Sequence, residues 1–143
     1  MKRKSHTQRA FRRTLRTFAR ILPVLLGVLA LASLATALVP PGRIVRAVPL
    51  EGLLGPWYGA AAGGLAIGHP LTSYVLAGEF SVAGFSVATV TAFLVSWVTV
   101  GTIHMAAEAT VFGWRFALWR NVVSFALAVA IGYALGFVVT VWG

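Results

Sequence analysis

One stretch of the chain, residues 55–80, is too apolar for water and too often interrupted for an ordinary transmembrane helix. It reads GPWYGAAAGGLAIGHPLTSYVLAGEF. Because proline lacks an N–H and restricts the residue before it, Gly68-His69-Pro70 predicts the end of one helix and the start of another. At membrane depth such a break is tolerated only where protein or a watery cavity covers the freed backbone. We expect residues 53–80 to form a re-entrant helix pair beside a polar cavity; a loosely packed glycine-rich helix followed by a loop is the alternative.

Glycine spacing predicts two faces for close helix packing. Gly55, Gly59 and Gly63 fall four apart, so they lie on one helical face and allow another backbone to approach. Gly132 and Gly136 repeat this spacing near the C-terminus. We expect both faces to pack against helices.

The composition favours a membrane protein over a soluble domain. Hydrophobic residues make up 59% of the 143 positions and charged residues only 10%, whereas soluble domains average about a quarter charged residues. The net charge is +9, and most of the basic residues lie within the first twenty positions. Since the rest is apolar, we expect the basic segment to meet anionic headgroups at the cytoplasmic face and not nucleic acid. The absence of cysteine excludes disulfides, thiolate metal sites and thiol nucleophiles.

Residues 1–20 are typical of a basic amphipathic helix lying on the membrane surface. Phe11, Leu15 and Phe18 recur on one helical face, and arginines occupy the remainder. An Arg-rich segment without acids also suits an organelle transit peptide or a disordered tail, and both stay open as alternatives.

Residues 21–39 form an apolar run whose helix would be about 28 Å long, enough to span the hydrocarbon core. Pro23 would lie in the first turn of that helix, where proline is tolerated. Residues 35–37, Ala-Thr-Ala, also resemble a signal-peptidase site. The long basic region and the full-length apolar run favour a retained span over a cleaved signal.

Two further spans are predicted at 87–112 and 121–142, with Gly101 a candidate break in the first of them and Ser86 its candidate N-cap. Between them, residues 113–120 alternate Trp and Arg with apolar residues, as at headgroup depth. The predicted fold class is therefore an all-α integral membrane protein with a single membrane domain, 1–143. It has about three transmembrane helices, a Gly/Pro-broken re-entrant pair and an N-terminal basic amphipathic helix.

Charge predicts the orientation, because basic residues near span ends mark the cytoplasmic side. If 53–80 returns to its own side, Arg115 and Arg120 join the N-terminal basic residues, and only Arg43 and Arg46 lie outside. That ten-to-two split is more uneven than the eight-to-four split of a full crossing. We expect a multi-pass protein of the cell inner membrane, with its N-terminus in the cytoplasm and its C-terminus outside.

Three ionisable residues beyond the N-terminal segment, Glu79, His104 and Glu108, are candidates for a substrate pathway, because burying such groups in a membrane is costly. His104 and Glu108 are four apart on one helical face. They could hold or relay a proton, or supply two ligands to a divalent cation. Two ligands alone make no metal site, so we predict none. A Glu108 that is merely solvated beside Trp114 and Arg115 is the alternative.

The residues around the predicted break could also line a pathway. His69, Thr72, Ser73 and Tyr74 could offer side chains and freed backbone groups to a polar solute. The alternatives are that His69 caps a helix end and that the hydroxyls bond carbonyls within their own helices. No nucleophile triad, phosphate-binding loop or strong metal spacing appears, so we expect neither an enzyme nor a cofactor.

From residue 59 to residue 121, on the segments AAGGLAIGHPLTSYVLAGEF and SVATVTAFLVSWVTVGTIHMAAEATVFGWRFALWRN, the chain resembles a family of predicted permeases that includes bacterial organoarsenical efflux permeases. The larger members look like two related halves, and this chain looks like one. The resemblance implies that the 68–70 break and residues 72–74 line the pathway. The cysteine-containing stretch of the larger members has no counterpart here, which argues against an arsenical substrate.

The predicted function is a permease-like transport subunit whose pathway forms in a homodimer or other homo-oligomer. The alternative is a non-transporting subunit or scaffold that packs against a larger membrane complex.

Overall fold

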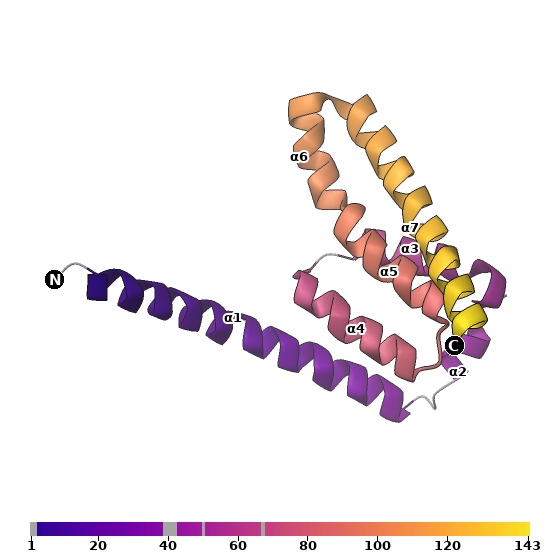
Figure 1. Ribbon diagram of the computed structural model, residues 1–143, viewed down its shortest axis with the longest axis horizontal. Helices are drawn as coiled ribbons and strands as arrows, with labels where there is room; N and C mark the ends of the chain where they lie inside the picture. The colour runs from indigo at the N-terminus through magenta and orange to yellow at the C-terminus, as the bar shows by residue number, and fades with distance from the viewer. Residues whose placement is uncertain (1–2, 39–42, 50, 67) are drawn as a thin grey trace.

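The computed structural model describes residues 3–38, 43–49, 51–66 and 68–143. All regular structure within these ranges is helical, which agrees with the predicted all-α class. The helices are α1 (Arg3–Leu38), α2 (Arg43–Ala47), α3 (Glu51–Leu65), α4 (Pro70–Val82), α5 (Val87–Thr99), α6 (Thr102–Phe112) and α7 (Trp114–Trp142). Figure 1 shows α1 as a long arm whose C-terminal part runs along α4 and whose N-terminal part extends away from the other helices.

By length and composition, two segments of the described chain qualify as membrane spans: Phe11–Leu31 within α1, and Trp114–Trp142, which is α7. Of the most apolar window in each, 0% in the first and 17% in the second is buried within the chain, whereas the core helix of a soluble protein is mostly buried. Large apolar side chains stay exposed along both helices. An exposed apolar surface of this extent suits a lipid environment.

Helices α3 and α4 form a hairpin whose two ends lie at the same end of the molecule. Helix α3 begins at Glu51, and a Glu51 carboxylate oxygen bonds the backbone N–H of Ser86, four residues beyond the end of α4. The legs have 15 and 13 residues, about 22 and 20 Å of helix. Each leg is shorter than a hydrocarbon core of about 30 Å. The predicted helix break between residues 53 and 80 is therefore present, and the chain turns back there.

Helices α3 and α7 both pack on the central helix α5 and also contact each other, and glycines bring the backbones close. Gly59 and Gly63 of α3 lie directly against the α5 backbone at Thr89 and Phe93. From α7, a Cβ on Gly132 would come within 2.6 Å of the carbonyl oxygen of Ala88. A small apolar core joins the three helices: Ala60, Ala92, Ala128 and Val129. The glycine faces thus serve packing within one chain.

The predicted N-terminal helix 1–20 and span 21–39 form one continuous helix, Arg3–Leu38; residues 1, 2 and 39 lie outside the described residues. Arg20 and Ile21 are both compatible with a helix, so nothing in the sequence stops it between them. The placement of Pro23 in a first turn was therefore wrong. It lies inside α1, where it denies the carbonyl of Ala19 its usual donor.

The candidate break at Gly101 within the predicted span 87–112 is present. Val100 and Gly101 adopt extended backbone, with φ of −105° and −120°, and separate α5 from α6. Gly101 is a poor helix residue, as the sequence indicates. The tip of the α3–α4 hairpin packs here too, because a Cβ on Gly64 would lie 2.8 Å from the Val100 side chain.

The last helix begins earlier than the predicted residue 121. Gly113 has a φ of +88°, a conformation that glycine adopts readily, and α7 starts directly after it at Trp114. The Trp- and Arg-containing segment predicted at the interface is therefore the first two turns of a 29-residue helix. Helix α7 runs antiparallel to α5, since Gly132 lies at Ala92 and Gly136 at Ala88.

Candidate functional site

The most distinctive arrangement in the fold is the meeting of two helix breaks. The α3–α4 break lies beside the α5–α6 break: Gly64 is next to Val100, and a Cβ on Gly68 would lie 3.0 Å from the Trp97 ring. The C-terminal ends of α3 and α5 and the N-terminal ends of α4 and α6 therefore converge on one region. Helix ends carry backbone groups without intrahelical partners and partial charges of opposite sign.

Local chemistry explains how α4 starts at this point. Pro70 occupies the first helical turn, and His69 precedes it with extended backbone. The Nδ1 atom of His69 accepts a hydrogen bond from the backbone N–H of Leu71 at 3.3 Å. His69 therefore caps the helix end, and its ring is exposed at the hairpin tip.

At the other end of the hairpin, one oxygen of Glu51 accepts three hydrogen bonds. The donors are the Ser86 N–H at 3.0 Å, the Ser86 hydroxyl at 2.9 Å and the Thr89 hydroxyl at 2.7 Å. Ser86 is also the N-cap of α5, as predicted, and accepts from the N–H of Thr89 at 3.3 Å. This cluster, Glu51–Ser86–Thr89, fastens the base of the hairpin to the first turn of α5.

The electrostatics of Glu51 follow from these donors. Partial burial alone would raise the pKa of its carboxyl, but the hydrogen bonds from the Ser86 backbone, the Thr89 hydroxyl and the Ser86 hydroxyl outweigh that effect. The pKa of Glu51 therefore lies below its usual value, and the carboxylate is charged at neutral pH. The N-terminal position of Glu51 in α3 adds a favourable interaction with the helix dipole.

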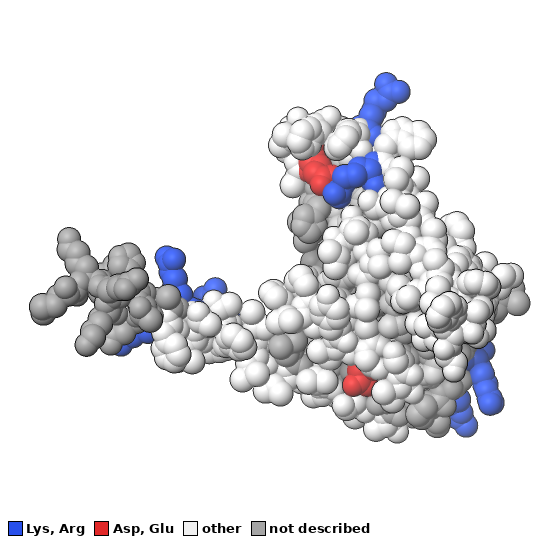
Figure 2. Space-filling model, viewed as in Figure 1, with Lys and Arg blue, Asp and Glu red and all other residues white. Residues whose placement is uncertain are grey.

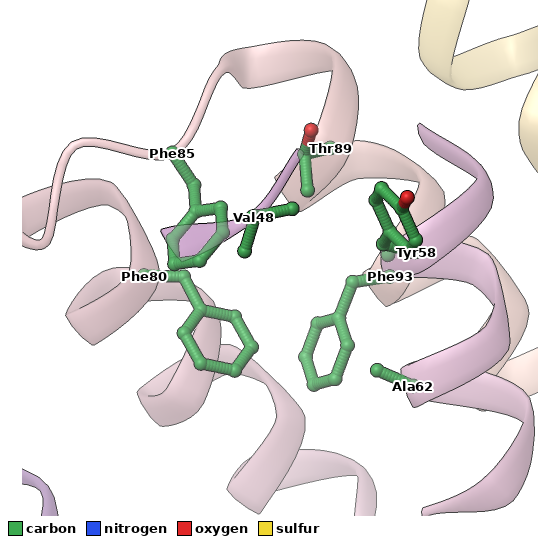
Figure 3. Close-up of a pocket in the computed structure, with 8 residues that line it drawn as sticks. Val48, Tyr58, Ala62, Phe80, Phe85, Thr89 and Phe93 are labelled. Atoms are coloured by element: carbon green, nitrogen blue, oxygen red, sulfur yellow. The ribbon is translucent and has the colours of Figure 1, made fainter. Parts of the chain in front are cut away.

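An apolar pocket of about 160 Å³ lies next to this cluster, between the hairpin, α5 and the segment after α2. Figure 3 shows Phe80, Phe85 and Phe93 around the pocket, with Tyr58 and Ala62 on the α3 side. Its full lining is Val48, Tyr58, Gly59, Ala62, Phe80, Phe85, Thr89 and Phe93. A lining this apolar fits a hydrocarbon group better than a polar solute or an ion.

An ion pair lies at the opposite end of the molecule from the Glu51–Ser86–Thr89 cluster, between α6 and α7. The Nε of Arg120 lies 2.7 Å from a carboxylate oxygen of Glu108. Both atoms are buried, and neither makes a well-aligned hydrogen bond within the described residues, so the contact is one of charge. It holds α6 against α7. Figure 2 shows basic and acidic surface together at this end, with further basic surface at the opposite end and on the arm.

The predicted pathway residues occupy separate regions of the chain. His69, Thr72 and Ser73 lie at the hairpin tip, whereas Glu79 lies in the last turn of α4, near the hairpin base. Glu108 pairs with Arg120 on the other side of the break. His104 falls within α6, but its side chain lies outside the described part of the structure.

The hydroxyls around the tip do not share one environment. Ser73 is buried and donates to the carbonyl of Pro70 at 2.7 Å, which is the local bonding considered for it above. Thr72 is buried as well, whereas Tyr74 is 63% exposed on the outside of the hairpin. Among the described residues, no group of three or more His, Asp or Glu side chains is placed to hold a metal ion.

Sequence reasoning missed Glu51, Arg120 and Asn121 as structural polar groups. Asn121 is buried in α7 and donates to the carbonyl of Ala117 at 2.9 Å. Glu51 offered one signal, because it is one of only three acids in the chain and precedes an apolar helical run. Its partners lie 35 and 38 positions away, and only the folded hairpin brings them together.

Comparison with protein-family models, with curated proteins and with solved structures finds no significant match to this chain.

Proposed function

We propose that the chain is a small integral membrane protein of the cell inner membrane that acts as a permease-like transport subunit. In this proposal α1, α5–α6 and α7 cross the bilayer, and α3–α4 is a re-entrant hairpin. The observation that carries the proposal is the meeting of the α3–α4 break with the α5–α6 break. Transporters that use discontinuous helices bind their substrates where such helix ends meet near the bilayer midplane.

The pathway in this proposal forms between copies of the chain. Within one chain the predicted pathway residues lie in separate regions. Ser73 and Glu108 already interact with other groups of the same chain, Ser73 with the carbonyl of Pro70 and Glu108 with Arg120. His69 and Tyr74 are exposed at the hairpin, so a second copy could complete a polar lining there. A two-fold pair is the commonest closed assembly, and an uneven distribution of basic residues favours parallel insertion of both copies.

A flux assay tests transport. The purified protein is reconstituted into liposomes, which are then assayed with urea, glycerol, Na⁺, K⁺ and H⁺ as probes. We expect flux above that of protein-free liposomes for at least one probe. Val100→Cys, placed at the meeting of the breaks, should react with a membrane-impermeant thiol reagent, and the reaction should reduce that flux. Val141→Cys, exposed on α7, is the control and should leave flux unchanged after the same treatment.

The second candidate function is a non-transporting membrane subunit that packs against a larger complex. The observation that favours it is the internal use of polar groups: Ser73 bonds Pro70, and Glu108 pairs with Arg120. Absence of flux for all five probes, together with Val100→Cys that reacts only with lipid-soluble reagents, would select this function over transport.

A further inference from the structure

The apolar pocket beside the hairpin base lies close to two exposed arginines. Val48 lines the pocket and is two residues from Arg46, at the end of α2. Helix α2 lies against the α4–α5 turn, because a Cβ on Gly84 would lie 3.8 Å from the Val45 side chain. Arg43 and Arg46 are both exposed. The apolar pocket and the two cations thus occur at the same end of the molecule.

We propose that this pocket, with a volume of about 160 Å³, holds a segment of an acyl chain of an anionic phospholipid, whose phosphate binds Arg43 and Arg46. The aromatic lining accepts hydrocarbon, and the guanidinium groups supply donors that match phosphate oxygens. The three hydrogen bonds to Glu51 leave its negative charge in place, so the two arginines supply the attraction for the phosphate. A soluble anion would use only the arginines, and an uncharged lipid only the pocket, whereas an anionic lipid uses both.

The position of the site agrees with this ligand. Helix α2 lies near the Gly84 turn and Gly136 of α7 lies against Ala88, so α2 and the C-terminal part of α7 are at the same end of the molecule (Figure 1), which is one end of a candidate span. Headgroups lie at the ends of spans, and arginine side chains extend to that depth. The inference rests on the membrane insertion in the proposed function but not on transport, so lipid binding and flux can fail independently.

Native mass spectrometry of the full chain in detergent tests the site. The probes are phosphatidylglycerol and phosphatidylcholine with identical acyl chains. The wild type should retain a phosphatidylglycerol molecule that Ala62→Phe, which fills the pocket, does not retain. Arg43→Gln and Arg46→Gln should each lower the preference for phosphatidylglycerol about fivefold, the effect of one basic side chain near an anionic headgroup. Glycerol phosphate, which has no acyl chain, should not displace the lipid.

Arg115→Gln is the matched control, because Arg115 is also exposed but lies at the other end of α7. It should leave the preference unchanged. If Ala62→Phe does not unfold cooperatively, Val48→Phe fills the same pocket from outside the helices. Equal lipid retention by the wild type and a folded pocket-filling variant would overturn the proposal. So would a preference that survives both arginine substitutions, or displacement by glycerol phosphate.

Discussion

Glu51 accepts hydrogen bonds from three donors through one carboxylate oxygen, and all three donors belong to the first turn of α5 or its N-cap. Hydrogen bonds to a charged group contribute about 1.5–3 kcal/mol, against about 0.5–1.5 kcal/mol for neutral pairs. Glu51→Gln keeps an acceptor but loses the charge. We expect the free energy of unfolding to fall by about 1–3 kcal/mol, measured by thermal or denaturant unfolding in detergent. The control, Glu79→Gln on α4, should change it by less than about 0.5 kcal/mol; equal losses would argue against the cluster.

The lowered pKa of Glu51 makes this contribution depend on pH. In the unfolded chain the carboxyl has its usual pKa of about 4.3, whereas in the folded chain it releases its proton at lower pH. The unfolded state therefore binds more protons in acid, and stability falls as pH falls through this range. The stability difference between wild type and Glu51→Gln should be full at neutral pH and should shrink below about pH 4. A difference that stays constant down to pH 3 would contradict this account.

At the scale of helices, glycine determines how closely α3 approaches α5. Gly59 lies against backbone atoms of Thr89 and Phe93, which have no alternative rotamer to adopt. Gly59→Ala should therefore force the helices apart and lower the free energy of unfolding by about 1–3 kcal/mol. Gly78→Ala on α4 is the control, since nothing lies within 4 Å of the added Cβ. The control should raise stability by about 0.5–1 kcal/mol through helix propensity. Equal effects of both substitutions would mean that α3 and α5 are not in backbone contact.

Local chemistry in the sequence was sufficient to predict some elements but not others. The break before Pro70 and the cap at Ser86 follow from residues next to each other, so both were predictable. The break at Gly101 could be named only as a candidate, because glycine in an apolar helix is often tolerated and the hairpin tip that packs there comes from distant sequence. The start of α7 depends on a positive φ at Gly113, which the sequence permits but does not require.

At the scale of the whole molecule, the arrangement of helices constrains the orientation in a membrane. The hairpin base, α2 and the C-terminal third of α7 lie at the same end of the molecule: Tyr133 of α7 donates a hydrogen bond to the carbonyl of Leu53, and Gly136 of α7 lies against Ala88 at the start of α5, near the Gly84 turn that α2 approaches. The α6–α7 turn, with Arg115 and Arg120, lies at the other end of α7. If α1 crosses the bilayer, its basic N-terminal half lies on the side opposite α2, which is the side of Arg115 and Arg120.

This arrangement predicts the side on which each terminus lies. Ten basic residues, eight of them in residues 2–20, would face the cytoplasm, and Arg43 and Arg46 would face outward. Single cysteines at Thr7, Gly113 and Gly143 report on this orientation without interference, because the chain contains no cysteine of its own. In intact cells an impermeant thiol reagent should label Gly143→Cys alone, and all three should react after the membrane is opened. Labelling of Gly113→Cys but not Gly143→Cys in intact cells would show that α7 has the opposite orientation in the membrane. The ten-to-two distribution of basic residues would then be wrong. Residues 53–80 would cross the membrane fully and would not form a re-entrant hairpin.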